Sequence, residues 1–226
     1  MKYLFYVAAM FAVVSVNAQI NFGVKAGVTA SALKMSDGTY DDLKMINGFT
    51  LGITTDLKLS EAFCIQSRLS LITKGCSNTG NAIVDREMVI LSLTKETARP
   101  LFLQLPIHLA YKINIGQNSK IVFNTGPYFA YGMKGKVKTK RVVNSDVIYN
   151  NENYDFFENH NNCFRRFDYG LGFGAGMEFG KFGFNVEYDL GLANISRSGD
   201  WILMDSPAEY VSAKLNCLSF TVGYKF

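Results

Sequence analysis

The sequence is poor in several residue types, and each shortage excludes a class of protein. Its 226 residues include four prolines and one tryptophan, but 18 phenylalanines, 12 tyrosines and 20 glycines. This composition favours many strands over helices. After residue 18, no apolar run approaches the roughly 18 continuous residues of a transmembrane helix, so none is predicted. The formal net charge of +4 is too mild to indicate nucleic-acid binding.

Cysteines are also few, and Cys64, Cys76, Cys163 and Cys217 match no zinc-binding or Cys-x-x-Cys spacing. We therefore predict neither a metal nor a cofactor, and we interpret the cysteines as unpaired small residues. A disulfide between Cys76 and Cys163 is the alternative, because both lie near expected loops and spacing does not choose among the pairings.

The first residues have the pattern of a secretory signal peptide. Lys2 precedes an apolar run from Leu4 to Val16, and small residues around Ala18 form a cleavage site. The run is shorter than the about 20 residues that a spanning helix needs. We predict that residues 1–18 are removed and that residues 19–226 form the domain. An uncleaved anchor is the alternative.

Alternation of apolar and polar residues is the strongest signal in the rest of the chain. In the segment 182–193, Phe182, Phe184, Val186 and Tyr188 share one face, while Glu187 lies on the other. Such alternation is typical of a strand with one apolar and one polar face. Eight strands are predicted, near residues 20–30, 48–59, 62–74, 101–112, 120–133, 167–179, 182–193 and 217–226.

The connections between these strands alternate in length. Short ones are expected near 60–61, 114–119 and 180–181, and long ones near 31–47, 75–100, 134–166 and 196–215. Short turns at one end and long loops at the other are typical of an outer-membrane barrel. The predicted fold is therefore all-β, an eight-stranded antiparallel up-and-down transmembrane β-barrel.

The volume of the apolar side chains indicates which face points outward. An eight-stranded barrel has an interior that side chains just fill, so it cannot hold phenylalanine, leucine and tyrosine from every strand. The polar face is compact, and four successive positions of this face are glycines, namely Gly170, Gly172, Gly174 and Gly176. We predict that the polar face lines the lumen. A soluble lipocalin-like barrel, with the apolar face inside, is the alternative.

Charged residues of both signs share the polar face, so we predict an ion-pair network in the lumen. Its members are Lys25, Asp56, Arg68, His108, Glu178, Glu187, Asp189 and Lys225. His108 could also serve a lipid-modifying barrel enzyme together with a serine and a carboxylate. A histidine satisfied within the polar lumen is the interpretation that we favour.

A basic segment follows the fifth predicted strand. Alternate residues there share one parity, which predicts that they continue the lumenal face of that strand as a ridge above the barrel mouth. Such a ridge could bind lipopolysaccharide phosphates or steer an anionic partner. A solvated edge that prevents aggregation is the alternative. The ridge comprises Lys134, Lys136, Lys138, Lys140 and Arg141.

Several stretches resemble the PorT-like outer-membrane β-barrel family. They are LQLPIHLAYK, NTGPYFAYG, FDYGLGFGAGMEFG, VEYDLGLANI and the terminal TVGYKF. The resemblance implies an exported eight-stranded barrel, and its founding member is linked to protein secretion and gliding. It also implies that the terminal Phe226 is read by the outer-membrane assembly machinery. Members often carry arginine before the tyrosine of the seventh strand, where this chain has Glu187.

These patterns together predict a non-catalytic, monomeric protein of the bacterial outer membrane. We expect it to act as an interaction or envelope- and secretion-associated component that recognises partners through long extracellular loops. The expected partners are outer-membrane lipids, lipopolysaccharide phosphates and a protein that the sequence does not identify. An envelope-lipid-modifying enzyme and a soluble carrier are the alternatives.

Overall fold

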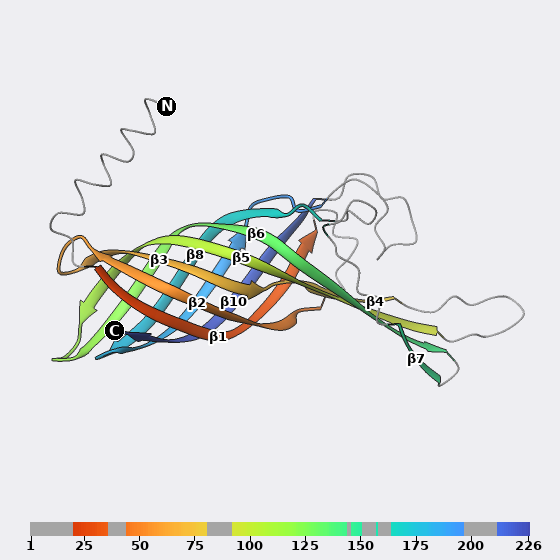
Figure 1. Ribbon diagram of the computed structural model, residues 1–226, viewed down its shortest axis with the longest axis horizontal. Coiled ribbons are helices and arrows are strands. Elements are labelled where there is room, and N and C mark those ends of the chain that lie inside the picture. The colour runs from red at the N-terminus through yellow and green to blue at the C-terminus, as the bar shows by residue number, and fades with distance from the viewer. Residues whose placement is uncertain are drawn as a thin grey trace, which may run out of the picture.

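The computed structural model describes ten strands and no helix in residues 20–35, 44–80, 92–143, 146–150, 157, 164–196 and 212–226. No helix in these segments is long and apolar enough to cross a membrane. Figure 1 shows the arrangement of the strands. Their bounds are β1 Ile20–Met35, β2 Ile46–Lys58, β3 Phe63–Thr73, β4 Cys76–Gly80, β5 Ser92–Asn114, β6 Ser119–Val143, β7 Asp146–Asn150, β8 Phe167–Phe179, β9 Phe182–Gly191 and β10 Ala213–Lys225.

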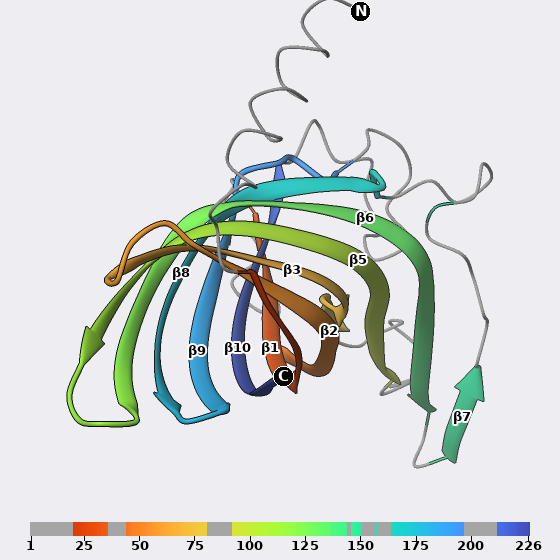
Figure 2. The same ribbon diagram turned by 60° about the vertical axis from the view of Figure 1, so that its left-hand side comes forward.

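Eight of the strands close into an antiparallel barrel. The order around it is β1, β2, β3, β5, β6, β8, β9 and β10, and β10 pairs with β1 from Gly23↔Lys225 to Met35↔Ala213. Figure 2 shows these strands curving around a central lumen. Closure leaves no free edge in the barrel wall, which a lipid environment requires. The predicted eight-stranded barrel is confirmed.

Two strands are much longer than the sequence pattern predicted. β5 has 23 residues and β6 has 25, so their hairpin projects beyond the other strands in Figure 1. The short strands β4 and β7, which were not predicted, pair with β5 and β6 respectively along this projection. One end of the barrel therefore carries an extended sheet. We call it the loop end, and the end with the short connections the turn end.

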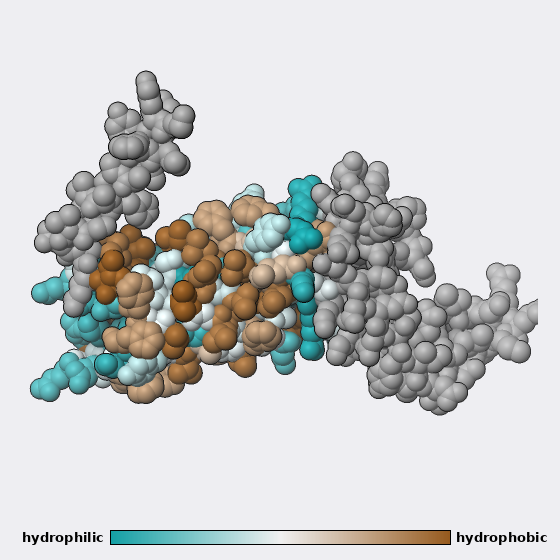
Figure 3. Space-filling view, in the orientation of Figure 1, coloured by the Kyte–Doolittle hydropathy of each residue, from teal (hydrophilic) through white to brown (hydrophobic). Residues whose placement is uncertain are grey.

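The apolar face points outward. In β9, Phe182, Phe184, Val186 and Tyr188 are all more than two-fifths exposed, whereas Glu187 and Asp189 are buried. Figure 3 shows the resulting brown belt, with hydrophilic residues on both sides of it. The face assignment from the sequence is confirmed, and the lipocalin-like alternative is wrong because its apolar face would point inward.

Aromatic rings gather near both margins of this belt. At the turn end, Phe182 contacts Tyr224 with ring centroids 5.3 Å apart, and Tyr224 contacts Phe226 at 5.9 Å. Near the loop end, Phe167 contacts Phe129 at 6.4 Å and Tyr169 at 6.0 Å. Two aromatic girdles around an apolar band are typical of outer-membrane barrels.

Candidate functional site

The lumen contains three layers of ion pairs. The layer nearest the turn end is a ring of two lysines and two carboxylates. Lys112 Nζ lies 3.1 Å from Asp56 Oδ2 and 3.0 Å from Glu178 Oε1, and Lys225 Nζ lies 2.6 Å from each of the same atoms. Each charge therefore has two opposite neighbours, and the ring links β2, β5, β8 and β10.

The middle layer is centred on Glu187 of β9. Its Oε1 lies 2.7 Å from Lys25 Nζ of β1, and its Oε2 lies 2.8 Å from Arg68 Nη2 of β3. All three side chains are at least 88% buried. One carboxylate thus compensates two cations that reach it from strands far apart in the sequence.

The third layer lies toward the loop end and is centred on Lys74, which is fully buried between β3 and β4. Its Nζ lies 3.1 Å from Asp189 Oδ2, 3.9 Å from Asp168 Oδ2 and 4.2 Å from the centre of the Tyr128 ring. The Tyr128 hydroxyl donates to Asp168 at 3.2 Å, and the Gln104 amide donates to Asp189 at 2.8 Å. These contacts link β5, β6, β8 and β9 to Lys74 at the centre of the lumen.

The three layers balance in charge. The cations are Lys25, Arg68, Lys74, Lys112 and Lys225, and the anions are Asp56, Asp168, Glu178, Glu187 and Asp189. A buried charge is costly unless it is paired and hydrogen-bonded, so this matching is what allows so many ions in a narrow lumen. Between the first two layers only a cavity of about 50 Å³ remains, lined by Lys25, Arg68 and Glu187 among others.

All the residues that were predicted for the network, except His108, take part in these ion pairs. The sequence interpretation left out Lys74, Lys112 and Asp168. Their lumenal parity was visible in the pattern, because Asp168 precedes the glycine stripe by two residues and Lys112 follows His108 by four. Parity alone did not show which polar residues meet across the lumen.

The glycine stripe on β8 makes room for these side chains. A Cβ at Gly172 would collide with the His108 ring, and a Cβ at Gly174 would lie 2.5 Å from Asn124 Oδ1 and 2.9 Å from Glu187 Cγ. Side chains of the two strands paired with β8, Asn124 of β6 and Glu187 of β9, and of His108 on β5 therefore occupy the space above the stripe. The stripe does accommodate larger residues, but those over Gly174 are its register partners on the neighbouring strands rather than residues across the lumen.

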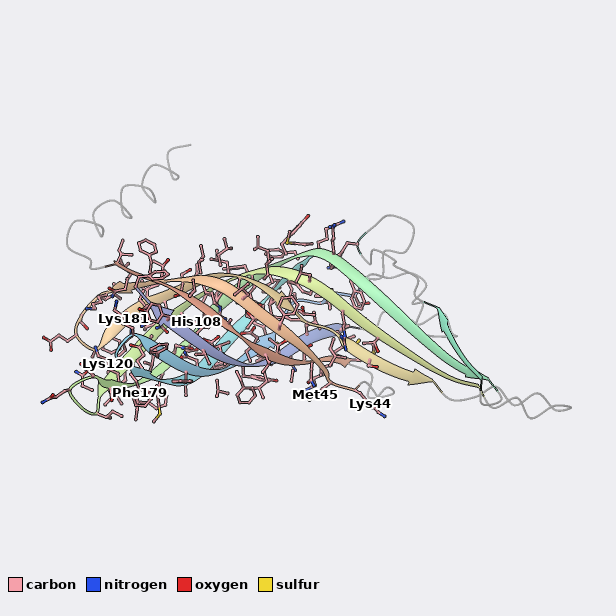
Figure 4. The ribbon with its side chains drawn as sticks, turned by 60° about the horizontal axis from the view of Figure 1, so that its bottom comes forward. Lys44, Met45, His108, Lys120, Phe179 and Lys181 are labelled. Atoms are coloured by element: carbon pink, nitrogen blue, oxygen red, sulfur yellow. The ribbon has the colours of Figure 1, made fainter. Side chains whose placement is uncertain are left out.

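His108 lies inside the barrel wall (Figure 4) and is 4% exposed. Its Nε2 has no hydrogen-bond partner among the described residues. No serine hydroxyl is paired with it, and it faces the filled lumen rather than the outward apolar surface. The arrangement that a lipid-modifying His–Ser site would need is therefore absent from the described part of the lumen.

An apolar plug closes the lumen at the loop end. Phe157 packs edge-on against Phe102 with ring centroids 6.1 Å apart and fills the space over Gly132. Arg166 lies over the Phe157 ring, with its Cζ 5.1 Å from the ring centre, and donates to the Phe157 carbonyl at 3.2 Å. The remaining cavity is about 10 Å³ and includes Leu33, Phe164, Ile195 and Leu215 in its lining.

The basic ridge lies on the extended hairpin, but a β-bulge changes its face. Phe102 pairs with Gly132 while Leu101 pairs with Lys134, so Met133 is an extra residue and the parity of β6 reverses there. Lys134 therefore pairs with Leu101, which lies on the outward face of β5, and Lys134 is itself exposed. The expectation that the ridge continues the lumenal face is therefore wrong at Lys134, where the ridge begins.

Beyond the bulge, the ridge backbone pairs with a segment of β5 that is also basic. Lys136 pairs with Arg99, Lys138 with Thr97, Lys140 with Lys95 and Arg141 with Thr94. These register positions continue the alternation of Lys134 along the hairpin. The structure therefore brings positive residues of β5 and β6 together on the projecting sheet.

Three cysteines lie inside the described protein. Cys64, Cys76 and Cys217 are buried and have free thiols, and Cys163 lies outside the described residues. Within the described segments, no cluster of histidine, cysteine and carboxylate residues could hold a metal ion.

Comparison with known proteins identifies one matching family. The outer membrane protein beta-barrel domain family matches residues 15–197. No curated protein matches the chain. Solved structures with a similar strand arrangement include OprG from Pseudomonas aeruginosa, which is 12% identical with a TM-score of 0.41 and coverage of 92% of this chain and 97% of that one.

Two further structures are similar to a comparable degree. Ail, the attachment invasion locus protein of Yersinia pestis, solved with the heparin analogue sucrose octasulfate, is 14% identical with a TM-score of 0.39, covering 92% of this chain and 99% of that one. Neisserial surface protein A is 10% identical with a TM-score of 0.39, covering 91% and 97% respectively.

Proposed function

This chain belongs to the outer membrane protein beta-barrel domain family, and from that premise we propose that it is a non-conducting, non-catalytic barrel that binds anions at the cell surface. The single observation that carries the proposal is the closed lumen beside a basic, projecting hairpin. An open lumen would favour transport, whereas a filled lumen leaves the outer surface and the loop end as places for recognition.

The absence of conduction follows from the packing of the lumen. Three layers of matched charges occupy it, and the plug around Phe157 closes its loop end. Passage of a solute would require several buried ion pairs to separate at once. We expect no single-channel current in a planar bilayer; a stable open level would contradict the proposal.

The basic ridge is the proposed anion-binding element. Lysine and arginine residues on neighbouring strands offer donors to phosphate oxygens, which is the contact that charge-assisted hydrogen bonds favour. Lys134, opposite Leu101, and Lys136, opposite Arg99, start this element just beyond the bulge. We propose lipopolysaccharide phosphates as its ligand.

The test exchanges the four ridge lysines, Lys134, Lys136, Lys138 and Lys140, for glutamine. Binding of the folded protein to purified lipopolysaccharide should weaken strongly and lose most of its salt dependence, because screened charge contacts supply the affinity. A control variant with Lys58→Gln and Lys181→Gln at the turn end should bind like the wild type. Unchanged binding by the ridge variant would refute the anion-binding proposal.

The PorT-like resemblance adds a finer proposal, namely that the chain is a monomer associated with protein secretion and contacts a further protein through its loop end. Crosslinking in outer-membrane fractions of expressing cells, with a photoreactive residue at Lys134, tests for that partner. Recovery of no protein other than the chain itself would argue against it.

We also propose that residues 1–18 are cleaved during export. These residues lie outside the described segments, so the support is the charge, the apolar run and the small residues around Ala18. Amino-terminal sequencing of the protein from outer membranes should begin at Gln19. A start at Met1 would indicate the uncleaved anchor.

A further inference from the structure

Basic side chains also surround the barrel wall itself at the loop end. Lys34 of β1, Arg99 of β5, Lys134 of β6, Arg165 before β8 and Lys214 of β10 are all exposed. Four of them lie in strands at the parity of outward apolar residues, and Arg165 precedes the exposed Phe167 by two residues. We call these five residues the collar.

The seam between β1 and β10 shows the height of the collar. Lys34 pairs directly with Lys214, and the outward pairs that follow toward the turn end are Ala32↔Asn216, Ala30↔Leu218, Val28↔Phe220, Ala26↔Val222 and Val24↔Tyr224. Ten residues of a strand tilted by about 40° rise roughly 25 Å, which is the height of the apolar band of an outer-membrane barrel. The two lysines therefore lie at the upper margin of this band, where lipid headgroups begin.

Among the described side chains, the exposed charges at this level are all positive. Among the described side chains, every carboxylate except Glu61 lies in the lumen, and Glu61 is in the turn after β2 at the opposite end. No salt bridge reaches Lys34 or Lys214 from any described residue. Two like charges directly opposite each other in a sheet repel. The pair of Lys34 and Lys214 has no anion within the described protein that would offset this repulsion.

We propose that the collar binds the phosphate groups of lipids in the leaflet that surrounds the loop end, with Lys34 and Lys214 as its central pair. Phosphorylated headgroups lie at the height of the collar and supply the missing negative charge. The aliphatic stems of the lysines can lie along the apolar band while their ammonium groups reach the headgroups. The inference rests on the proposed outer-membrane location. Its central pair, Lys34 and Lys214, lies on strands other than those of the ridge, and Lys134 is the residue that the collar and the ridge share.

The test measures lipid binding to the folded, full-length protein by native mass spectrometry from detergent micelles. The probes are diphosphoryl lipid A and its dephosphorylated form. The test variant carries Lys34→Gln and Lys214→Gln, and the control carries Lys58→Gln and Lys181→Gln, which remove the same charge at the turn end. Heat-modifiability on a gel verifies that each variant has folded.

Wild-type protein should retain diphosphoryl lipid A and not the dephosphorylated form. Each lysine near a charged membrane surface increases the binding affinity about fivefold, so the loss of two lysines should weaken lipid binding by the test variant roughly 30-fold. Binding by the control should be unaffected. Equal binding by the test variant and the wild type would overturn the collar. Displacement of the lipid by inorganic phosphate at the same molar concentration would overturn the lipid as its ligand.

Failure of the proposed function would be recognised separately. A wild-type protein that neither shifts on heating nor enters vesicles would refute the outer-membrane proposal itself. A folded protein that loses lipid A when Lys136, Lys138 and Lys140 are exchanged for glutamine, but keeps it in the Lys34→Gln/Lys214→Gln variant, would support the ridge and overturn the collar.

Discussion

Replacement of Glu187 by glutamine removes the only anion of the middle lumenal layer with almost no change in side-chain size. Lys25 and Arg68 would then remain close together, with side chains that are 12% and 7% exposed. At an effective dielectric constant of about 20, each lost attraction amounts to about 4 to 6 kcal/mol before desolvation is considered. Measured losses for one partner of a buried pair suggest a net destabilisation of about 3 to 5 kcal/mol.

Equilibrium urea unfolding in detergent micelles, followed by the heat-modifiable gel shift, gives this free energy. Glu61→Gln, in an exposed turn, is the matched control and should change stability by less than about 0.5 kcal/mol. A second variant that makes the whole layer apolar, with Lys25→Met, Arg68→Met and Glu187→Leu, should recover much of the lost stability. A loss below about 1 kcal/mol for Glu187→Gln would refute the view that the layer is a coupled unit.

Three further outcomes follow from the packing. Gly174→Ala should destabilise the barrel by about 1 to 3 kcal/mol in the same unfolding assay, because the added Cβ would overlap a neighbouring side chain. Gly183→Ala is the control and should be neutral, because the nearest atom to its added Cβ would be 3.7 Å away. Lys74→Met should cost about 3 to 5 kcal/mol, because two carboxylates lose their buried cation. In a Cys163→Ser background, the Cys76 thiol should resist maleimide at pH 7.5 until urea unfolds the protein, since burial raises the pKa of Cys76 to about 12.

Alternation along the strands was enough to predict the barrel and its two faces. Side-chain direction has a period of two in any regular strand, and an eight-stranded lumen has too little volume to hold so many aromatic residues, so they must point outward. The charged residues of the lumen could be identified by the same parity. Their partners could not, because pairing across the lumen depends on stagger between strands such as β1 and β9.

The facing of the ridge could not be predicted from alternation. One extra residue, Met133, reverses the parity of the rest of β6, and the alternation of apolar and polar residues does not reveal this bulge. The same limitation applies to β4 and β7, which are short strands inside segments expected to be loops. Their pairing is set by the long β5–β6 hairpin rather than by their own composition.

Glu187 illustrates how a single position can change the lumenal network. The family resemblance led us to expect arginine before the tyrosine of this strand, and the chain instead has a carboxylate that pairs with Lys25 and Arg68. A cation at this position would meet two other cations. Replacement of Glu187 therefore has to be considered together with the residues that face it from β1 and β3.

The distribution of lumenal charge among the strands has a consequence for assembly. The segment from β3 to β5 contributes three cations, Arg68, Lys74 and Lys112, to the network and no carboxylate, whereas β8 and β9 contribute four carboxylates and no cation. Neither of these two segments could enter a bilayer alone without carrying unmatched charge into the hydrocarbon, which is costly. Lys225 and Lys25 complete the pairing only when the last strand meets the first. Insertion should therefore proceed as one concerted event, in which the two oppositely charged walls enter the membrane already facing each other.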